Sequence, residues 1–509
     1  MRRARAALAA LAVASALLLS GCSGFPLPTV TSTPAPVTAV AAPLRPYYGQ
    51  RLVWKDCGNG FRCTTAVAPL DWKDPSGPRI HLALTQHPAS GHRIGTLFMN
   101  PGGPGVSGVD FLQGSASAFF DQSLLDSYDI VAWDPRGVGH STPAVDCYGT
   151  KQLDGFLFDD PNLPDGSAAL ARHVKATDTA FGAACKAKTG PLLAHVDTES
   201  TVQDLDMLRG DVGSPRLDYF GFSYGTLIGA LYADRYPTRV GRMALDGAVD
   251  PANTAFDENL ANTKAFGAAL QTYLAHCIAT AGCPFDRMTV DEATATIATL
   301  LVRLRESPLR AKDGRKVNSA VLRTAIDAAL YDERDWPALT QALAQVLKGD
   351  PTTTLELADS YTDRTAHGYA DNLFEALYAV DCLDKPVETD PAVLAEEGRQ
   401  LTAADPLRAA DTGESLGDQV CAHWPVKPTA VQHRVHATGS PPILVLGTTG
   451  DPATPFSWAQ SLASQLQHGV LIGWRGQGHT AYRNHVPCVN QRVDAFFTAG
   501  TVPSPVMCG

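Results

Sequence analysis

A serine between two glycines, at the junction of an apolar run and a helical pattern, constrains this chain most. Residues 217–226 read LDYFGFSYGT, which places Ser223 between Gly221 and Gly225. A serine on a tight strand-to-helix turn projects its hydroxyl group, and glycines two residues to either side leave room for the neighbouring strand and helix. The helix N-terminus behind the turn favours developing negative charge. The segment therefore predicts a nucleophilic serine in an α/β architecture.

A serine nucleophile needs a general base and a group that orients that base. Asp451 follows the strand-like run 443–446, and His479 follows the strand-like run 470–474. The chain order serine, aspartate, histidine is the one expected when each residue comes directly after a strand. We therefore predict Ser223, Asp451 and His479 as the catalytic residues.

Each partner of the serine has an alternative interpretation. His485 is the nearest other histidine that could act as the base, but it lies six residues beyond His479 and close to Cys488. Asp451 could instead be a turn residue that precedes Pro452. No other acidic residue lies on that loop, which favours Asp451 as the orienting group.

A glycine-rich loop at 97–108, LFMNPGGPGVSG, has two possible meanings. With Asp134 after the next apolar run, the G-x-G-x-x-G from Gly103 to Gly108 is typical of a dinucleotide-binding unit. Acyl transfer instead needs two backbone N–H donors, one after the nucleophile and one from a loop after an earlier strand. Because the catalytic residues are present, we predict an oxyanion hole formed by Gly103 and Tyr224, with no cofactor and no metal.

The periodicity of apolar residues divides the chain into parts. Strands and helices alternate over 47–250, residues 251–430 are helical with no convincing strand, and the alternation resumes over 431–509. Such alternation is typical of a mostly parallel central sheet flanked by helices. We predict an α/β fold with a large helical cap, 251–430, inserted between two core parts, 47–250 and 431–509.

The N-terminus is typical of an exported protein. Residues 1–21 have a basic start, a short apolar run and small residues at the end, which indicates a signal peptide. LSGC at 19–22 resembles the bacterial lipobox, so Cys22 is predicted to carry a lipid; ordinary cleavage is the alternative. The proline- and threonine-rich stretch 22–46 is predicted to be a semi-rigid tether. The chain would then reach the outer face of the membrane only through this anchor, with a secreted form as the alternative.

Charge and cysteine content narrow the possible partners. The formal net charge is −11, and removal of residues 1–21 with their three arginines makes it −14. This charge argues against nucleic-acid binding. Besides Cys22 there are ten cysteines and no C-x-x-C, which favours disulfides over zinc. Spacing leaves the connectivity open, but sequence neighbours suggest Cys57–Cys63, Cys147–Cys185, Cys277–Cys283, Cys382–Cys421 and Cys488–Cys508.

Several motifs resemble one family. GGPG at 102–105, DPRGVGHS at 134–141 and GFSYG at 221–225 resemble the proline iminopeptidase-like branch of the α/β-hydrolases. GDPATP at 450–455 and GQGHTAY at 476–482, with the last two cysteines, resemble the exported tripeptidyl aminopeptidases of actinobacteria. The similarity covers roughly residues 50–509 and is weak in the helical part. Pro101 stands where the iminopeptidases have histidine, which puts iminopeptidase-like specificity in doubt.

The resemblance implies an α/β-hydrolase fold and a specific activity. It implies the release of short peptides, tripeptides in the named enzymes, from peptides or small proteins with a free N-terminus. In this family the cap supplies acids for the substrate ammonium, and the matching candidates are Glu375, Asp381 and Asp384. Asp134 and Arg136 would brace the loop beside the site.

Two other function classes stay open at this point. A catalytic triad does not distinguish ester from amide substrates, so a carboxylesterase or lipase of the same fold is the alternative. A protein that kept the fold only as a binding surface is a second alternative, which the complete triad opposes.

Overall fold

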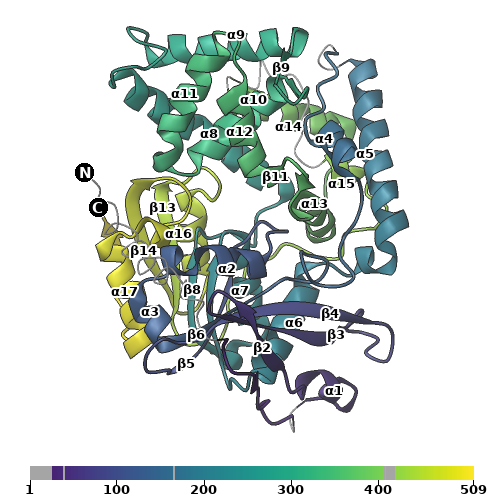
Figure 1. Ribbon diagram of the computed structural model, residues 1–509, viewed down its shortest axis with the longest axis vertical. Coiled ribbons are helices and arrows are strands. Elements are labelled where there is room, and N and C mark those ends of the chain that lie inside the picture. Colours follow the sequence, from purple (N-terminus) through teal and green to yellow (C-terminus); the bar gives the residue numbers. More distant parts are fainter. Residues whose placement is uncertain (1–25, 38–39, 164–166, 406, 408–418) are drawn as a thin grey trace, which may run out of the picture.

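The computed structural model describes residues 26–37, 40–163, 167–405, 407 and 419–509 (Figure 1). The predicted signal peptide, Cys22 and the first residues of the predicted tether lie outside the described residues. In this part of the chain one large sheet carries two helical layers on its faces and a block of helices at one end (Figure 1).

The large sheet has eleven strands in the order β1-β2-β3-β4-β6-β5-β7-β8-β13-β14-β15. The strands up to β4 pair antiparallel with their neighbours, and all pairs from β6 to β15 are parallel. The predicted α/β fold with a mostly parallel sheet is confirmed. The strands are β1 (Val30–Thr31), β2 (Val53–Gly58), β3 (Phe61–Pro69), β4 (Arg79–His87), β5 (Gly95–Asn100), β6 (Tyr128–Trp133), β7 (Leu217–Phe222), β8 (Val240–Asp246), β13 (Ile443–Gly450), β14 (Gly469–Gln477) and β15 (Val506–Cys508).

Both faces of the central strands are buried, which explains their continuous apolar sequences. In β5, Phe98 joins the core on one face, while Leu97 and Met99 join the core on the other, as the alternation of side chains in a strand requires. The Phe98 face is covered by α1 (Arg45–Tyr48), α6 (Thr198–Asp211), α7 (Tyr224–Arg235) and α16 (Phe456–Gln465). The opposite face is covered by α2 (Gly108–Phe119), α3 (Gln122–Ser127) and α17 (Pro487–Ala499).

The helical block, defined as the described residues between β8 and β13, forms the green layer beyond one end of the sheet in Figure 1. Its helices are α8 (Ala255–Ile278), α9 (Val290–Glu306), α10 (Ser319–Leu330), α11 (Trp336–Val346), α12 (Thr352–Tyr361), α13 (Leu373–Asp384), α14 (Pro391–Ala404) and α15 (Gln419–Ala422). The expectation of no strand here was wrong. The block contains two hairpins, β9 (Leu309–Arg310) with β10 (Lys316–Val317) and β11 (Arg364–Thr365) with β12 (Gly368–Tyr369). Two-residue strands are too short to produce a periodic signal.

Two helices from the first half of the chain join the helical block. α4 (Thr150–Leu157) and α5 (Ala168–Thr189) lie between β6 and β7 in sequence but beside α13 and α15 in space (Figure 1). Phe156 stacks on Phe181, with ring centroids 4.1 Å apart, and both rings contact Tyr378 of α13. The sequence pattern places this segment in the predicted core part 47–250, whereas the structure places α4 and α5 against the helical block.

All five suggested disulfides are present. They join Cys57–Cys63, Cys147–Cys185, Cys277–Cys283, Cys382–Cys421 and Cys488–Cys508. Such a framework is typical of proteins exported to an oxidising compartment. Over the described ranges, no helix is long and apolar enough to cross a membrane.

Candidate active site

Ser223 occupies a strained turn between β7 and α7. Its backbone has φ 54° and ψ −127°, a region that residues with a side chain rarely adopt. The turn is held on both sides, because the Ser223 N–H donates to the Asp246 carbonyl at 2.9 Å and the Thr226 N–H donates to the Ser223 carbonyl at 2.8 Å. The strand, the turn and the helix therefore fix where the hydroxyl group lies.

The flanking glycines have the steric role that the sequence predicted. A Cβ atom on Gly221 would lie 2.4 Å from the Gly225 carbonyl oxygen, and one on Gly225 would lie 2.6 Å from the Asn100 carbonyl oxygen. Both distances are shorter than any real Cβ contact. Larger residues at these two positions would displace α7 or β5.

Asp451 and His479 form a buried pair. His479 Nδ1 lies 2.9 Å from Asp451 Oδ1, and the Asp451 carboxylate also accepts the N–H groups of Ala453, Thr454 and Thr480. Asp451 is 2% exposed. Because the carboxylate accepts a hydrogen bond from the Nδ1–H group, the neutral imidazole keeps a lone pair on Nε2, the arrangement that a general base requires.

The end of β8 brings Ser223 and His479 to the same place. Asp246 accepts the Ser223 N–H, and a Cβ atom on the next residue, Gly247, would lie 3.1 Å from His479 Cε1. His479 Nε2 is buried and has no hydrogen-bond partner among the described residues, Ser223 Oγ included. Catalytic hydrogen bonds are often long in free enzymes and tighten when substrate binds.

Two polar residues support the pair and were not predicted. Thr454 Oγ1 donates to Asp451 Oδ2 at 3.0 Å and lies 3.3 Å from His479 Nδ1. The Asp246 carboxylate accepts the N–H groups of Ala481 and Tyr482, just after His479, and burial raises the pKa of Asp246 to about 6. Thr454 stands in the GDPATP segment, which is the sequence signal that could have found it.

The glycine loop lies against the serine turn. A Cβ atom on Gly102 would lie 2.8 Å from Ser223 Cβ and 3.1 Å from the Tyr224 nitrogen. The Gly102 N–H donates to Asn100 Oδ1, so it is turned away from the serine. Tyr224 is the first residue of α7, and its N–H therefore has no acceptor within its own helix. The Tyr224 N–H is therefore a donor next to Ser223 in the chain, and Gly103 follows Gly102 in the loop that touches the serine turn.

Comparison with known proteins identifies the relatives of this chain. It is 35% identical to serine protease Hip1 of Mycobacterium tuberculosis, over 90% of this chain and 91% of Hip1. It is 34% identical to carboxylesterase B of the same organism, over 96% of this chain and 97% of that protein. A family model described as TAP-like protein matches residues 408–508. The chain belongs to the TAP-like family of α/β-hydrolases.

A more distant sequence relative agrees with this assignment. The tripeptidyl aminopeptidase of Streptomyces coelicolor is 28% identical over 89% of this chain and 85% of its own length. Among solved structures, a proline iminopeptidase of Mycobacterium smegmatis aligns with a TM-score of 0.34 at 14% identity, covering 84% of this chain and 98% of that one. The family assignment rests on the sequence relatives.

His485 of this TAP-like hydrolase lies outside the site. Its Nδ1 is 3.1 Å from Asp121 and its Nε2 is 3.0 Å from the Ala118 carbonyl, at the surface beside α2 and α3. Both ring nitrogens are therefore engaged away from Ser223.

Asp134 and Arg136 hold loops in place, as expected. The buried Asp134 carboxylate accepts the Ser107 hydroxyl and the N–H groups of Val109 and His140, which ties the glycine loop to the loop after β6. The buried Arg136 guanidinium lies 2.7 Å from Asp204 of α6.

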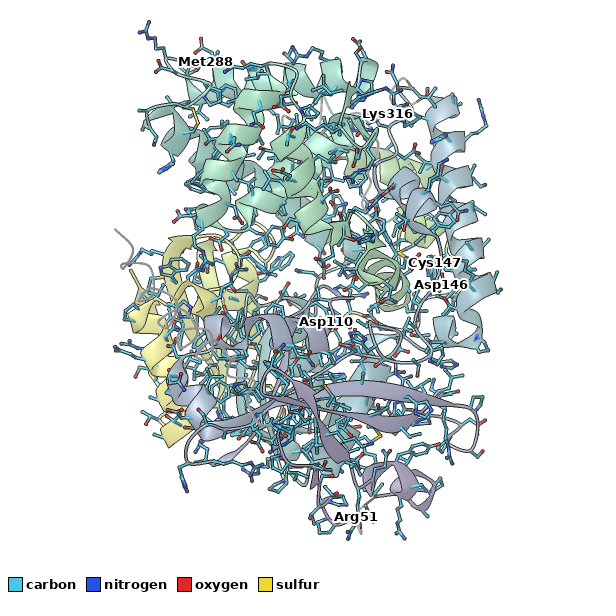
Figure 2. The ribbon with its side chains drawn as sticks, in the orientation of Figure 1. Arg51, Asp110, Asp146, Cys147, Met288 and Lys316 are labelled. Carbon is cyan, nitrogen blue, oxygen red and sulfur yellow. A yellow bond between two sulfur atoms is a disulfide. The ribbon has the colours of Figure 1, made fainter. Side chains whose placement is uncertain are left out.

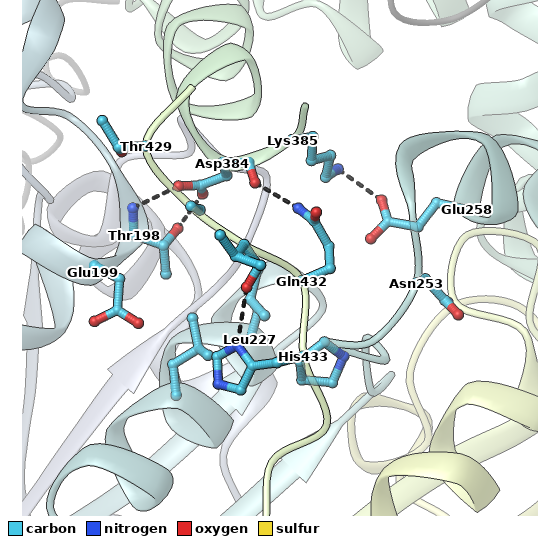
Figure 3. A pocket seen from close by; sticks show the side chains of 14 residues that line it. Thr198, Glu199, Leu227, Asn253, Glu258, Asp384, Lys385, Thr429, Gln432 and His433 are labelled. Atoms are coloured by element: carbon cyan, nitrogen blue, oxygen red, sulfur yellow. Dashed lines mark hydrogen bonds and ion pairs between the residues drawn. The ribbon is translucent and has the colours of Figure 1, made fainter. Parts of the chain in front are cut away.

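The three acids proposed for the substrate ammonium all lie on α13, and two of them hold the helical block to the core. Glu375 accepts the N–H groups of Cys147 and Tyr148 at 3.2 and 2.5 Å, and burial raises its pKa. Asp384 accepts the Thr198 N–H at 2.9 Å and contacts the Thr198 hydroxyl (Figure 3). Burial raises the pKa of Asp384 to about 8.

The third acid, Asp381, belongs to an ion-pair group beside a cavity. Its carboxylate lies 3.2 Å from the Lys385 ammonium, which is also 2.7 Å from Glu258. Glu258 and Asp384 line a cavity of about 290 Å³ next to α7 (Figure 3). The single Lys385 ammonium balances one of the two carboxylate charges of Asp381 and Glu258.

Another acidic group, which the sequence did not indicate, lies nearer the glycine loop. Asp110 of α2 stands where the helical block meets the sheet layer (Figure 2). Burial and the nearby charges of Asp363 and Asp110 raise the pKa of Asp371 to about 6. His140 lies 2.9 Å from Asp110. Asp110 lies far in sequence from Asp363 and Asp371, so no local sequence motif predicts this group of three acids.

Proposed function

We propose that this TAP-like hydrolase is a serine peptidase with Ser223, His479 and Asp451 as its catalytic triad. Ser223 Oγ attacks the scissile carbonyl carbon while its proton passes to His479 Nε2. The imidazolium gives that proton to the leaving amine, and an acyl-enzyme remains. A water molecule then attacks the acyl carbon with His479 as base, and Ser223 leaves as the restored hydroxyl. The observation that carries this proposal is the buried His479–Asp451 pair with its unpartnered Nε2 beside the strained serine.

The N–H groups of Tyr224 and Gly103 stabilise the oxyanion of each tetrahedral intermediate. Tyr224 also lies at the N-terminus of α7, where the helix dipole favours negative charge. Removal of one such donor typically lowers kcat by about 10²–10³-fold.

The substrate class follows from the relatives and from the acids. Hip1 is named a serine protease, and the Streptomyces relative is named a tripeptidyl aminopeptidase. We propose that this chain releases short peptides, preferentially tripeptides, from the free N-terminus of its substrates. Asp110, Asp363 and Asp371 offer excess negative charge near the glycine loop for the substrate ammonium. Of the acids on α13, Asp381 is the one not used to hold the core.

Carboxylesterase activity is the second candidate. Carboxylesterase B is 34% identical to this chain over 97% of its own length, nearly the same identity as Hip1. The proposed acyl-enzyme mechanism can also cleave esters, because the alcohol of an ester leaves more readily than the amine of a peptide.

Export and anchoring complete the proposal. The signal-like segment and the disulfides support export, and the lipobox-like segment supports a lipid on Cys22. We expect the wild-type protein to fractionate with the cell envelope and a Cys22→Ala protein to appear in the medium. Soluble wild-type protein with an unmodified Cys22 would exclude the anchor.

One experiment separates the two activities. Purified protein is incubated with fluorogenic mono-, di- and tripeptide amides, each with a free or an acetylated N-terminus, and with short-chain esters. The peptidase proposal predicts cleavage of free tripeptide amides and little cleavage of acetylated ones, and Ser223→Ala should remove both peptide and ester activity. Equal cleavage of free and acetylated peptides would overturn the aminopeptidase proposal, and cleavage of esters alone would establish the esterase.

A further inference from the structure

Three aromatic side chains of the helical block form a continuous row beside the site. The rings of Tyr331 and Tyr361 lie 5.7 Å apart, and those of Tyr361 and Phe374 lie 6.0 Å apart. We call Tyr331, Tyr361 and Phe374 the aromatic row. Its members come from three separate segments, the turn after α10, the end of α12 and the start of α13, so they meet only in the folded protein.

One end of the row lies on the proposed general base. The Tyr331 ring packs edge-on to the His479 imidazole, with centroids 5.4 Å apart and an interplanar angle of 85°. The Tyr331 carbonyl accepts the His479 N–H at 2.8 Å. Contacts from both the ring and the backbone fix this end relative to the imidazole.

The other end of the row lies on the glycine loop. A Cβ atom on Gly105 would lie 2.3 Å from the carbonyl oxygen of Leu373, the residue next to Phe374. Because Gly105 follows closely after Gly103, Phe374 stands next to the loop of the proposed oxyanion donor. The row thus runs from the base to the oxyanion loop, the two groups between which a scissile carbonyl must lie.

The middle of the row is exposed, and its two ends are partly buried. Tyr361 is 37% exposed and belongs to the few exposed large hydrophobic residues of the described chain. The two phenol oxygens lie 3.4 Å from each other, and both rings are uncharged near neutral pH, since tyrosine ionises only at about pH 10. The charge next to Tyr331 is already balanced, since Asp332 is paired with Arg334 and Arg483.

We propose that the aromatic row is a substrate subsite for an apolar side chain on the residue whose carbonyl is attacked. With the carbonyl carbon at Ser223 and its oxygen at the Gly103 N–H, the substituent on the adjacent carbon lies within reach of the rings of the helical block that pack beside that loop and beside His479. Aromatic and branched apolar side chains gain contact with these rings, and a charged side chain loses hydration without finding a partner. The inference rests on the proposed acyl-enzyme chemistry but not on the peptide preference.

Two substrate series test the subsite. One is Ala-Ala-X amides with a free N-terminus, and the other is p-nitrophenyl esters of acetylated X, where X is Phe, Leu, Ala or Asp. We expect kcat/KM for X = Phe or Leu to exceed that for X = Asp by at least about 10-fold in the wild-type protein. Tyr361→Ala and Phe374→Ala should each reduce this ratio by about 10-fold, with little change for X = Ala.

Matched variants separate the subsite from a structural effect. Tyr361→Phe keeps the ring and should keep the preference, and Val302→Ala, an exposed position of α9 remote from the row, should leave all ratios unchanged. Ratios that stay at the wild-type value in both Tyr361→Ala and Phe374→Ala would overturn the subsite. If the amides are not cleaved at all, the peptidase proposal fails, and the ester series alone decides on the row.

Discussion

The Thr198 hydroxyl oxygen lies 2.5 Å from the Tyr224 phenol oxygen. The same hydroxyl group contacts the Asp384 carboxyl group (Figure 3). All three groups are buried. Asp384 belongs to α13, and Tyr224 supplies one of the two proposed oxyanion N–H groups. The chain of hydrogen bonds therefore connects the helical block to the residue beside the nucleophile.

Loss of this connection should lower turnover without weakening substrate binding. We expect Thr198→Val and Tyr224→Phe each to reduce kcat by about 10-fold with little change in KM, because a displaced donor stabilises the transition state less. The double variant should cost no more than the worse single variant, since both delete the same hydrogen bond. Thr272→Val, on the exposed face of α8, is the control. Additive losses in steady-state kinetics would refute the connection.

His479 and His485 provide a matched pair for the base. His479→Asn should lower kcat by about 10⁴–10⁶-fold and abolish labelling by a fluorophosphonate probe, because Ser223 then has no proton acceptor. His485→Asn should keep nearly wild-type kcat, since both nitrogens of His485 face Asp121 and the Ala118 carbonyl. The reverse order of the two activities would reassign the base.

Gly105 should tolerate no side chain. Its φ is +98° and an added Cβ atom would lie 2.3 Å from the Leu373 carbonyl oxygen, so Gly105→Ala must displace either the glycine loop or α13. We expect a lower Tm and a kcat reduced by about 10²-fold. Gly114→Ala, in the interior of α2 with open space around it, should raise the stability by up to about 1 kcal/mol. Thermal melts and kinetics of both variants check this contrast.

Buried Asp211 should make the stability depend on pH. Burial raises the pKa of Asp211 to about 8, although its side chain accepts two hydrogen bonds from Gln50. Between the unfolded value near 3.8 and this folded value the native state binds more protons. The contribution of Asp211 to the free energy of unfolding is therefore present at acid pH and falls as the pH rises, by up to about 1.4 kcal/mol per pH unit.

Replacement by an uncharged residue should flatten this dependence. Relative to the wild type, Asp211→Asn should gain in Tm as the pH rises from 5 to 8, whereas Asp286→Asn at an exposed position should show a constant difference. Parallel Tm curves for the wild type and Asp211→Asn would show that Asp211 does not titrate in this range.

The sequence contained the parts of the site that depend on local structure. A strand pattern followed by a turn predicts each of the three residues: Ser223 between its two glycines, and Asp451 and His479 after their strands. The five disulfides join cysteines that are neighbours in the order of cysteines along the chain, but spacing had left their connectivity open. The residues that determine each turn of the site are close together in the chain, so a pattern can record them.

Contacts between distant segments were not predictable in this way. The sequence does not distinguish Glu375 and Asp384 from solvent-exposed acids on a helix. Only their hydrogen bonds to Cys147 and Thr198 in the folded chain show that they are buried and bind other segments. Asp110, Asp363 and Asp371 approach one another from unrelated positions. The aromatic row likewise requires the fold of the whole block, because no periodic pattern links its three segments.

Because α4 and α5 pack on the helical block, chimeras between related enzymes must take both segments into account. The layer opposite the sheet is assembled from two insertions, and Cys147–Cys185 fastens the first of them while Cys382–Cys421 fastens the second. A chimera that transplants only the segment between β8 and β13 would leave Phe156 and Phe181 facing a foreign surface. We therefore expect a chimera made from this chain to keep its specificity only when both insertions are exchanged together.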